Sequence, residues 1–144
     1  MKESSKVKFQ HVSVATIATA LYKRGLRHQV IQGAGPVGWK GANMVGPAFT
    51  LRYMPAREDR NGIEVFRDPE HKQRVAIETC PEGHVLVMDS RKQADAASAG
   101  DILLTRLMKR GAAGVVTDGG FRDAMNIAQL DMPAYHTRPS SPTN

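Results

Sequence analysis

The spacing of apolar residues predicts a first helix over residues 13–24. Its apolar residues recur every three or four positions and therefore share one helical face. Ser13 belongs to the residue types that cap helix N-termini, and Gly25 stands where a glycine commonly ends a helix. The residues of the apolar face are Val14, Ile17, Ala18 and Leu21.

The same criterion predicts a second, longer helix over residues 98–110. Gly111 follows it and acts as a stop signal. Residues 70–79 and 122–130 are predicted to form shorter helices. The inward-facing residues of the long helix are Leu103, Leu104, Leu107 and Met108.

Four segments have the pattern of β-strands. Residues 47–54 alternate between apolar and polar positions, whereas residues 84–89 and 114–117 are the continuous apolar runs typical of buried strands. A short strand is predicted at residues 133–136. Because strands and helices alternate along the chain, the sequence predicts an α/β fold with parallel strand pairs.

The remaining segments lack a regular pattern. Residues 1–12 are predicted to be a flexible, basic lead-in, and residues 32–47 a loop rich in glycine and proline. Residues 138–144 are predicted to be a turn-like tail. The 144 residues fit one domain, and we expect a single domain over residues 1–144.

The composition is that of an ordinary globular domain. Hydrophobic residues make up 41% of the chain, which argues against wholesale disorder. The single cysteine, Cys80, excludes an intramolecular disulfide and a cysteine-rich zinc site, which favours a cytoplasmic location. No apolar run approaches the roughly 18 residues of a membrane span, and the polar N-terminus lacks a secretory signal, so no membrane partner is expected.

The chain is basic, with 20 Lys and Arg against 14 Asp and Glu and a net charge of +6. Such a balance is found on nucleic-acid-binding surfaces, and it also suits small anionic substrates. The longest basic cluster, residues 23–28, has few aromatic residues interleaved for stacking on bases. A dispersed basic surface is therefore favoured, and nucleic acid is not expected as a partner.

Three common cofactor or catalytic patterns have little support. Gly33–Gly38 matches the glycine pattern of dinucleotide-binding loops, but Pro36 interrupts it, so a simple glycine-rich loop is the better interpretation. The five histidines show none of the spacings of a zinc site. Cys80 has no partner nearby in the sequence and is not favoured as a nucleophile.

Residues 97–101 place Asp101 at the start of the long helix. The free N–H groups and the positive dipole end of a helix N-terminus can bind a carboxylate. Alternatively, Ser98 and Asp101 form a capping box, with aspartate in place of the usual glutamate or glutamine. Both interpretations stay open, because one aspartate can cap a helix and also take part in chemistry.

Residues 118–123 follow a buried strand at its carboxyl end, where α/β folds commonly bind ligands. Gly119 and Gly120 would allow the backbone to approach a ligand closely. Arg122 can bind a carboxylate through two hydrogen bonds, and Asp123 offers an oxygen ligand suited to Mg²⁺ or Mn²⁺. The alternative is a surface turn in which Asp123 caps a helix and Arg122 is merely exposed.

Together these motifs resemble the RraA-like family, which includes 4-hydroxy-4-methyl-2-oxoglutarate aldolases, oxaloacetate decarboxylases and regulators of ribonuclease E. The most specific part of the resemblance is the spacing in which 20 residues separate Asp101 from the pair Arg122 and Asp123. The other similar segments are residues 16–21, 46–52, 83–89 and 111–123.

The resemblance implies a β/β/α swivelling-domain fold, assembled as a homotrimer or a hexameric dimer of trimers with active sites between subunits. It implies that Asp123 holds a divalent cation, Mg²⁺ or Mn²⁺, largely through water. Arg122 would bind the pyruvyl carboxylate and the oxygen that becomes an enolate, and Asp101 would position the water that transfers the proton. Backbone N–H groups would complete the substrate site, from Gly100, Asp101, Ile102 and Leu103.

The chain departs from the family pattern at three places. Thr19 and Asn126 stand where acids are usual. Longer members continue beyond the equivalent of residues 142–144 with further strands and a helix, so the resemblance implies a chain that lacks them.

The activity expected from the resemblance is that of a metal-dependent carbon–carbon lyase acting on a small keto acid. Retro-aldol cleavage and oxaloacetate decarboxylation leave the same enolate, so one site can perform both. The alternative is a non-catalytic protein that binds and regulates a ribonuclease. The positive charge and Asn126 favour that alternative.

Overall fold

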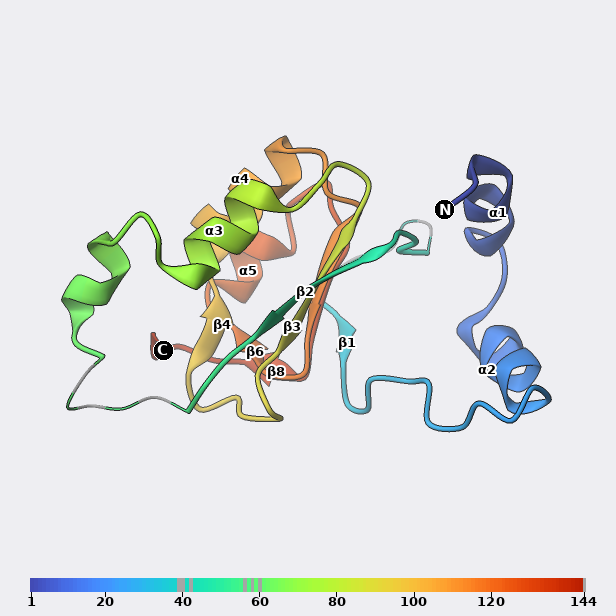
Figure 1. Ribbon diagram of the computed structural model, residues 1–144, viewed down its shortest axis with the longest axis horizontal. Coiled ribbons are helices and arrows are strands. Elements are labelled where there is room, and N and C mark those ends of the chain that lie inside the picture. The colour runs from blue at the N-terminus through green and yellow to red at the C-terminus, as the bar shows by residue number, and fades with distance from the viewer. Residues whose placement is uncertain (39–40, 42, 56, 58, 60, 144) are drawn as a thin grey trace.

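Two sheets and a layer of helices form the body of the molecule (Figure 1). The computed structural model describes residues 1–38, 41, 43–55, 57, 59 and 61–143. The larger sheet has the strand order β1-β7-β5-β3-β2, and the smaller sheet has the order β4-β6-β8. The elements are α1 (Glu3–Phe9), α2 (Val14–Tyr22), β1 (Gly35–Pro36), β2 (Ala48–Arg52), the 3₁₀ helix η1 (Ile63–Arg67), α3 (Lys72–Thr79), β3 (Val85–Asp89), β4 (Ala97–Ala99), α4 (Asp101–Lys109), β5 (Gly114–Thr117), β6 (Gly120–Phe121), α5 (Ala124–Ile127), β7 (Ala134–His136) and β8 (Arg138–Pro139).

The predicted α/β fold is confirmed. All four predicted strands form, as β2, β3, β5 and β7, and they pair in parallel. The predicted helices also form, although the one at residues 122–130 is reduced to the single turn α5. The two sheets with their covering helices agree with the expected β/β/α arrangement.

The core lies between the larger sheet and the helices α3, α4 and α5, which gather on one side of that sheet (Figure 1). Leu86 of β3 pairs with Val115 of β5, and neither side chain is exposed. Leu104 and Leu107 of α4 are equally buried and belong to the same cluster. Removing these apolar surfaces from water holds α4 on the sheet, and the start of α4 is thereby fixed in place.

The smaller sheet was not predicted, because its strands have only two or three residues and no readable period. Its third strand, β8, lies in the segment predicted to be a turn-like tail. The Ser140 N–H donates to the Phe121 carbonyl at 2.9 Å, and the Ala97 N–H donates to the Pro142 carbonyl at 2.8 Å. The segment predicted to be a turn-like tail thus contains the strand β8 at residues 138–139, and tertiary hydrogen bonds hold residues 140–143 beside the smaller sheet. Asn144 lies outside the described residues.

The N-terminal residues form an arm that stands apart from the body (Figure 1). The lead-in predicted to be flexible contains the helix α1, an element that the sequence pattern did not indicate. Helix α2 confirms the predicted caps: the Thr16 N–H donates to the Ser13 hydroxyl, and Gly25 adopts a φ of +79°. No residue of α2 is buried, and on its apolar face Val14 is exposed whereas Ile17, Ala18 and Leu21 are half-buried.

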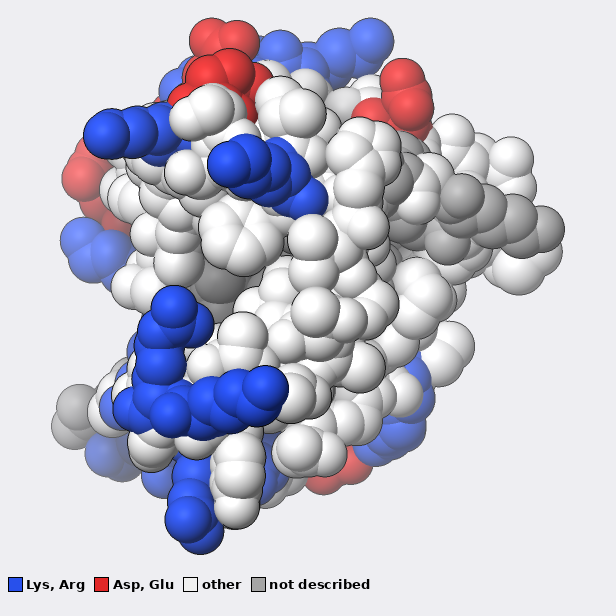
Figure 2. All heavy atoms as spheres, turned by 90° about the vertical axis from the view of Figure 1, so that its right-hand side faces the viewer, with Lys and Arg blue, Asp and Glu red and all other residues white. Residues whose placement is uncertain are grey.

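Figure 2 looks onto the side of the molecule that carries this arm. Several Lys and Arg side chains gather at the lower left of this face and others lie near its top, with a wide uncharged area between them. Within the part of the chain that the structure describes, no helix is both long and apolar enough to span a bilayer.

The glycine-rich segment at residues 33–38 forms the edge of the larger sheet. Gly35 and Pro36 make up β1, which pairs antiparallel with β7. A Cβ at Gly38 would lie 2.6 Å from the Cβ of Ala128, so this glycine allows the backbone to pack closely. These contacts give the segment a structural role, which agrees with the preference for a structural glycine-rich segment over a dinucleotide-binding loop. Residues 39, 40 and 42 of the predicted loop lie outside the described residues.

Candidate active site

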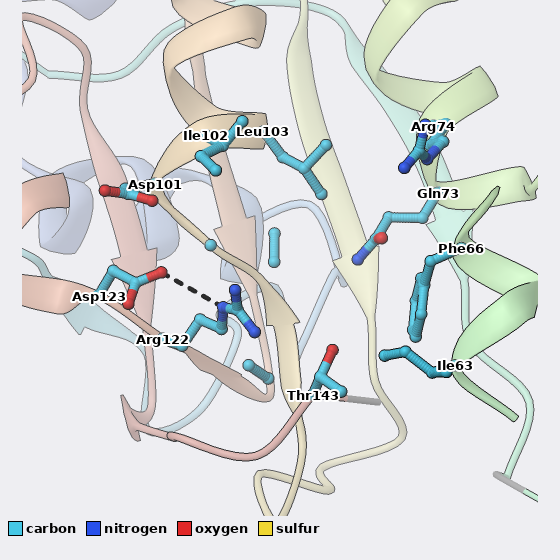
Figure 3. Close-up of a pocket in the computed structure, with 13 residues that line it drawn as sticks. Ile63, Phe66, Gln73, Arg74, Asp101, Ile102, Leu103, Arg122, Asp123 and Thr143 are labelled. Atoms are coloured by element: carbon cyan, nitrogen blue, oxygen red, sulfur yellow. Dashed lines mark hydrogen bonds and ion pairs between the residues drawn. The ribbon is translucent and has the colours of Figure 1, made fainter. Parts of the chain in front are cut away.

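The site residues expected from the sequence line one cavity of about 310 Å³ (Figure 3). The cavity lies where β4 passes into α4 and where β6 passes into α5. Neighbouring parallel strands of the smaller sheet thus bring together two segments that are 20 residues apart in the chain. The expected residues that line the cavity are Gly100, Asp101, Ile102, Leu103, Arg122 and Asp123.

The N-terminus of α4 presents free N–H groups to the cavity. Leu104 is the first residue whose N–H finds a helical acceptor, the Gly100 carbonyl at 3.1 Å. The N–H groups of the three preceding residues, 101–103, make no hydrogen bond with the described chain, and the N-cap Gly100 supplies no side chain. Unsatisfied donors at a helix N-terminus are suited to binding an anion.

The capping box expected from Ser98 and Asp101 does not form. Ser98 lies in β4 and is 2% exposed. Its hydroxyl forms hydrogen bonds with those of Ser90 at 2.7 Å and Thr117 at 2.8 Å. This prediction was wrong because the tertiary pairing of β4 draws Ser98 away from the helix, and the N–H groups of α4 are left available.

Gly100 allows the two halves of the site to approach each other. A Cβ at this position would lie 2.8 Å from Asp123 Oδ2 and 3.0 Å from Arg122 Nε. Both distances are shorter than an ordinary contact, so any larger residue would displace these side chains. The glycine therefore lets Arg122 and Asp123 pack closely over the start of α4.

Arg122 and Asp123 form an ion pair beside the cavity. Arg122 Nε lies 3.3 Å from Asp123 Oδ2, and the two side chains are 44% and 37% exposed. The Nη groups of Arg122 make no hydrogen bond with the described residues and can bind a ligand. Asp123 has a φ of +55°, an uncommon conformation for a residue other than glycine. It is the N-cap of α5 but its side chain makes no capping bond, so its carboxylate is directed to other partners.

Asn126 reaches across from α5 to the start of α4. Its Nδ2 donates a hydrogen bond to Asp101 Oδ2 at 2.7 Å. An acid at position 126 would instead face Asp101 with a like charge. The asparagine therefore orients the Asp101 carboxylate, a contact that sequence reasoning did not anticipate. Thr19, the other departure noted above, lies on α2, where its hydroxyl donates to the Ala15 carbonyl.

The cavity offers the carboxylates of Asp101 and Asp123 as candidate oxygen ligands for a cation. No group of three or more His, Cys, Asp or Glu that could hold a metal is found within the described ranges of the chain. Mg²⁺ commonly binds to proteins through one or two carboxylates and otherwise keeps water ligands. The donor set therefore suits a hydrated Mg²⁺ or Mn²⁺ and does not suit a protein-only metal cage.

A buried group of three hydroxyls connects the two sheets beneath the cavity. Ser90 follows β3, Ser98 lies in β4 and Thr117 ends β5, and their hydroxyls lie 2.7–3.1 Å apart. The amide of Gln73 on α3 donates to the Ser98 carbonyl at 2.6 Å. These bonds fix β4, and with it the start of α4. In the sequence, the only sign of this hydroxyl group is that the apolar run at residues 114–117 ends in the polar residue Thr117.

Gly119 and Gly120, which could allow a close approach of the backbone to a ligand, have a structural role in the fold. A Cβ at Gly119 would lie 2.7 Å from the Gln93 carbonyl oxygen, and one at Gly120 would lie 2.7 Å from the Arg138 carbonyl oxygen. Both glycines thus approach the protein's own backbone, because the chain crosses here from the larger to the smaller sheet. Neither lines the cavity.

Cys80 is 1% exposed and belongs to the core. Burial raises the pKa of its thiol, with a smaller opposing effect from Arg110. A thiol with a raised pKa carries little thiolate at neutral pH, which agrees with the expectation that it is not a nucleophile.

His136 supports the strand that carries Arg122. The Phe121 N–H donates to His136 Nδ1 at 3.3 Å, which requires an unprotonated nitrogen. Burial lowers the pKa of His136 from its ordinary value of 6.5. The unfolded chain therefore binds a proton at pH values where the folded chain does not.

A loss of stability is accordingly expected on mild acidification. The contribution of neutral His136 is fully present above about pH 6.5 and is lost as the pH falls toward its lowered folded-state pKa. His136→Asn keeps an acceptor oxygen but cannot titrate, so its unfolding free energy should depend less on pH. Urea unfolding at pH 5.5 and 7.5 measures this, with His11→Asn at an exposed position as control. If the unfolding free energy of His136→Asn falls between pH 7.5 and pH 5.5 by as much as that of wild type, His136 is not the group responsible.

Comparisons with known proteins bear on the whole chain. A family model of the RraA-like type, described as Aldolase/RraA, matches residues 14–143. The chain is similar to Streptomyces coelicolor RraAS2, described as an unusual member of the RNase ES inhibitor RraA protein family, with 29% identity, a TM-score of 0.79 and coverage of 99% of this chain and 66% of that one.

Two further structures share the fold. An uncharacterized protein from Pseudomonas syringae pv. tomato is 23% identical with a TM-score of 0.77, and the match covers 99% of this chain and 60% of that protein. The RNA-processing inhibitor RraA from Thermus thermophilus is 21% identical with a TM-score of 0.65, and the match covers 92% of this chain and 71% of that protein. The chain thus spans less than two thirds of the length of the first two structures.

Proposed function

We propose, from the premise that the chain belongs to the RraA-like family, that it is a divalent-metal-dependent carbon–carbon lyase acting on pyruvyl acids. The reactions are retro-aldol cleavage of 4-hydroxy-4-methyl-2-oxoglutarate-type substrates and decarboxylation of oxaloacetate. The observation that carries the proposal is the shared cavity. It gathers the first N–H groups of α4, the Nη groups of Arg122, which make no bond with the described residues, and the carboxylates of Asp101 and Asp123.

These groups divide into donors for the substrate and acceptors for a cation or a proton. Arg122 binds the pyruvyl carboxylate and the adjacent keto oxygen, and the N–H groups of residues 101–103 complete that binding. Both sets of donors face the oxygen on which negative charge develops. Because they are already oriented by the fold, they stabilise the transition state more than they stabilise the substrate.

In both reactions the bond next to the pyruvyl C3 breaks, and its electron pair remains as the enolate of pyruvate. Oxaloacetate loses CO₂, whereas the aldol substrate passes its hydroxyl proton to the water that Asp101 positions and releases a second carbonyl product. The enolate then takes a proton at C3, from a water that Asp101 positions. A bound Mg²⁺ or Mn²⁺ would supply a Lewis acid for the enolate oxygen, and Asp123 would hold its water ligands.

Asp123→Asn is expected to raise the Mg²⁺ or Mn²⁺ concentration needed for half-maximal activity by about 10–100-fold, as is usual when an outer-sphere partner of a metal is lost. The activity is measured as pyruvate released from oxaloacetate, with a chelator as blank. Mn²⁺ binding, followed by water proton relaxation, provides a readout independent of turnover.

Asp131→Asn, at an exposed position outside the cavity, is the matched control and should behave as wild type. A wild-type protein without metal-dependent pyruvate release would overturn the proposed function. An Asp123→Asn variant with wild-type metal dependence would overturn the role of Asp123.

A second candidate function is supported by the similarity to RraAS2, whose description names inhibition of a ribonuclease. In this alternative the chain binds a ribonuclease of the E type without catalysing a reaction. Asn126 is the residue that favours it, because it removes an acid that the lyase pattern usually carries. Capture of purified ribonuclease by the tagged chain, together with absent turnover, would favour this function.

We also propose assembly into a homotrimer or a hexamer. The exposed side chains of the arm support it, because α2 has no buried residue. Val14 and Tyr22 on α2 are 62% and 58% exposed. Light scattering coupled to size exclusion measures the mass, and a strictly monomeric chain would contradict this proposal.

A further inference from the structure

A second arginine lines the cavity on the side away from Arg122. Arg74 projects from α3, whereas Arg122 follows β6, and Figure 3 shows the cavity between them. One guanidinium is sufficient to bind one carboxylate, so the second guanidinium on the opposite wall can bind another anionic group. A volume of about 310 Å³ suits a small metabolite rather than a nucleotide.

Arg74 is exposed, and its guanidinium makes no hydrogen bond or ion pair with the part of the chain that the structure describes. The acid one turn further along α3, Glu78, is already bound by Arg106 at 2.9 and 2.8 Å and by Arg110 at 3.4 Å. Arg52 is likewise paired with Asp89. Arg74 therefore differs from these arginines in having its guanidinium available.

The position of Arg74 is fixed by its neighbour in the chain. Gln73 is 6% exposed, and its amide donates to the Ser98 carbonyl at 2.6 Å. This bond ties α3 to β4, which leads into the N-terminus of α4. Arg74 is thereby held at a set place relative to the donors that face it across the cavity.

We infer that Arg74 binds the second carboxylate of a dicarboxylic keto acid whose pyruvyl end lies at Arg122. This inference rests on the proposed function and deepens it by naming the group that recognises the distal end of the substrate. Arg74 is a specificity-determining residue in this assignment, since it does not contact the reacting bond. Guanidinium is well suited to the role because it can bind a carboxylate through two parallel hydrogen bonds.

The assignment separates the two reactions. In retro-aldol cleavage of 4-hydroxy-4-methyl-2-oxoglutarate, the second carboxylate survives on the departing pyruvate, so Arg74 binds it equally in the substrate and in the transition state. In decarboxylation of oxaloacetate, the second carboxylate is the group that leaves as CO₂. A guanidinium bound to it stabilises charge that must be lost, and this slows the reaction. Arg74 thus favours aldol cleavage over decarboxylation.

Binding of unreactive acids tests the inference without depending on turnover. The probes are 2-oxoglutarate, which carries a second carboxylate, and pyruvate, which does not. Arg74→Gln should weaken 2-oxoglutarate binding by about 10–100-fold, the range for loss of a hydrogen bond to a charged group, and should leave pyruvate binding unchanged. Arg122→Gln should weaken both. Arg67→Gln, a nearby exposed arginine that does not line the cavity, is the control for net charge.

Turnover gives the second readout. For the aldol substrate, Arg74→Gln should raise KM with little change in kcat, as expected for loss of uniform binding. For oxaloacetate, its kcat should be equal to that of wild type or higher. A structural defect would lower both activities together.

The possible failures are distinguishable. If wild type turns over both substrates but Arg74→Gln binds 2-oxoglutarate as wild type does, the inference is overturned and the proposed function stands. If wild type turns over neither substrate, the proposed function is overturned. The binding ratio of 2-oxoglutarate to pyruvate then decides by itself whether Arg74 recognises a second carboxylate.

Discussion

Replacing Arg122 by alanine is expected to lower kcat/KM for oxaloacetate by about 10²–10³-fold, the usual cost of removing one donor aimed at a developing oxyanion. The Nη groups of Arg122 make no bond with the described residues, so they can contact substrate. The side chain of Arg122 packs against Gly100, the residue at the start of α4. Without the guanidinium, the N–H groups of residues 101–103 and a bound Mg²⁺ would remain to stabilise the enolate oxygen. Steady-state pyruvate release at saturating Mg²⁺ measures the loss.

Two comparisons isolate the effect of the guanidinium. Arg122→Lys keeps the charge but loses the two-pronged geometry, so it should recover only part of the activity. The unfolding free energy of Arg122→Ala should change by no more than about 1 kcal/mol, because the ion pair with Asp123 is exposed at 44% and 37%. Wild-type kcat/KM in Arg122→Ala would contradict the proposed role.

Replacing Phe121 by alanine is expected to lower the unfolding free energy by about 3–5 kcal/mol, the range for truncating a buried aromatic side chain. Phe121 is 0% exposed and belongs to the core cluster although its strand, β6, has only two residues. Its ring lies 5.8 Å from that of His136, centroid to centroid. The truncation removes the packing between the smaller sheet and the helices.

Urea unfolding at pH 7.5 measures this loss of stability. Met125→Ala is the matched control, because Met125 lies nearby on α5 and is 81% exposed, so its unfolding free energy should stay within about 0.5 kcal/mol of wild type. Phe121→Leu keeps most of the apolar volume and should be intermediate. If Phe121→Ala is as stable as Met125→Ala, the smaller sheet does not contribute to the cooperative core.

The larger sheet and its main helix were predictable because their apolar residues form continuous runs in the strands and recur at helical spacing in α4. The runs at residues 85–89 and 114–117 are buried in parallel pairs, and the inward face of α4 follows the spacing of its leucines. Local preference was also sufficient for the caps of α2, which Ser13 and Gly25 provide. In each case the signal lies within a few residues and does not depend on distant partners.

The smaller sheet and the arm were not predictable in the same way. Strands of two or three residues have no period, and β8 becomes a strand only because it pairs with β6. Helix α1 forms in a segment whose composition suggested flexibility. The capping prediction for Ser98 failed for the same reason: a hydroxyl with buried partners in distant strands bonds to them in preference to a local N–H.

The sequence by itself determined the class of the fold, the two helices that bear the strongest apolar period, and the residue types available for an anion and a cation at positions 101, 122 and 123. Only the tertiary structure decided how those residues are used. It placed Asn126 on Asp101, left the N–H groups of α4 free, and brought Arg74 to the far wall of the cavity. The physical reason is that periodicity and capping are short-range effects. The shape and charge of a cavity depend on contacts between segments tens of residues apart, which no local pattern records.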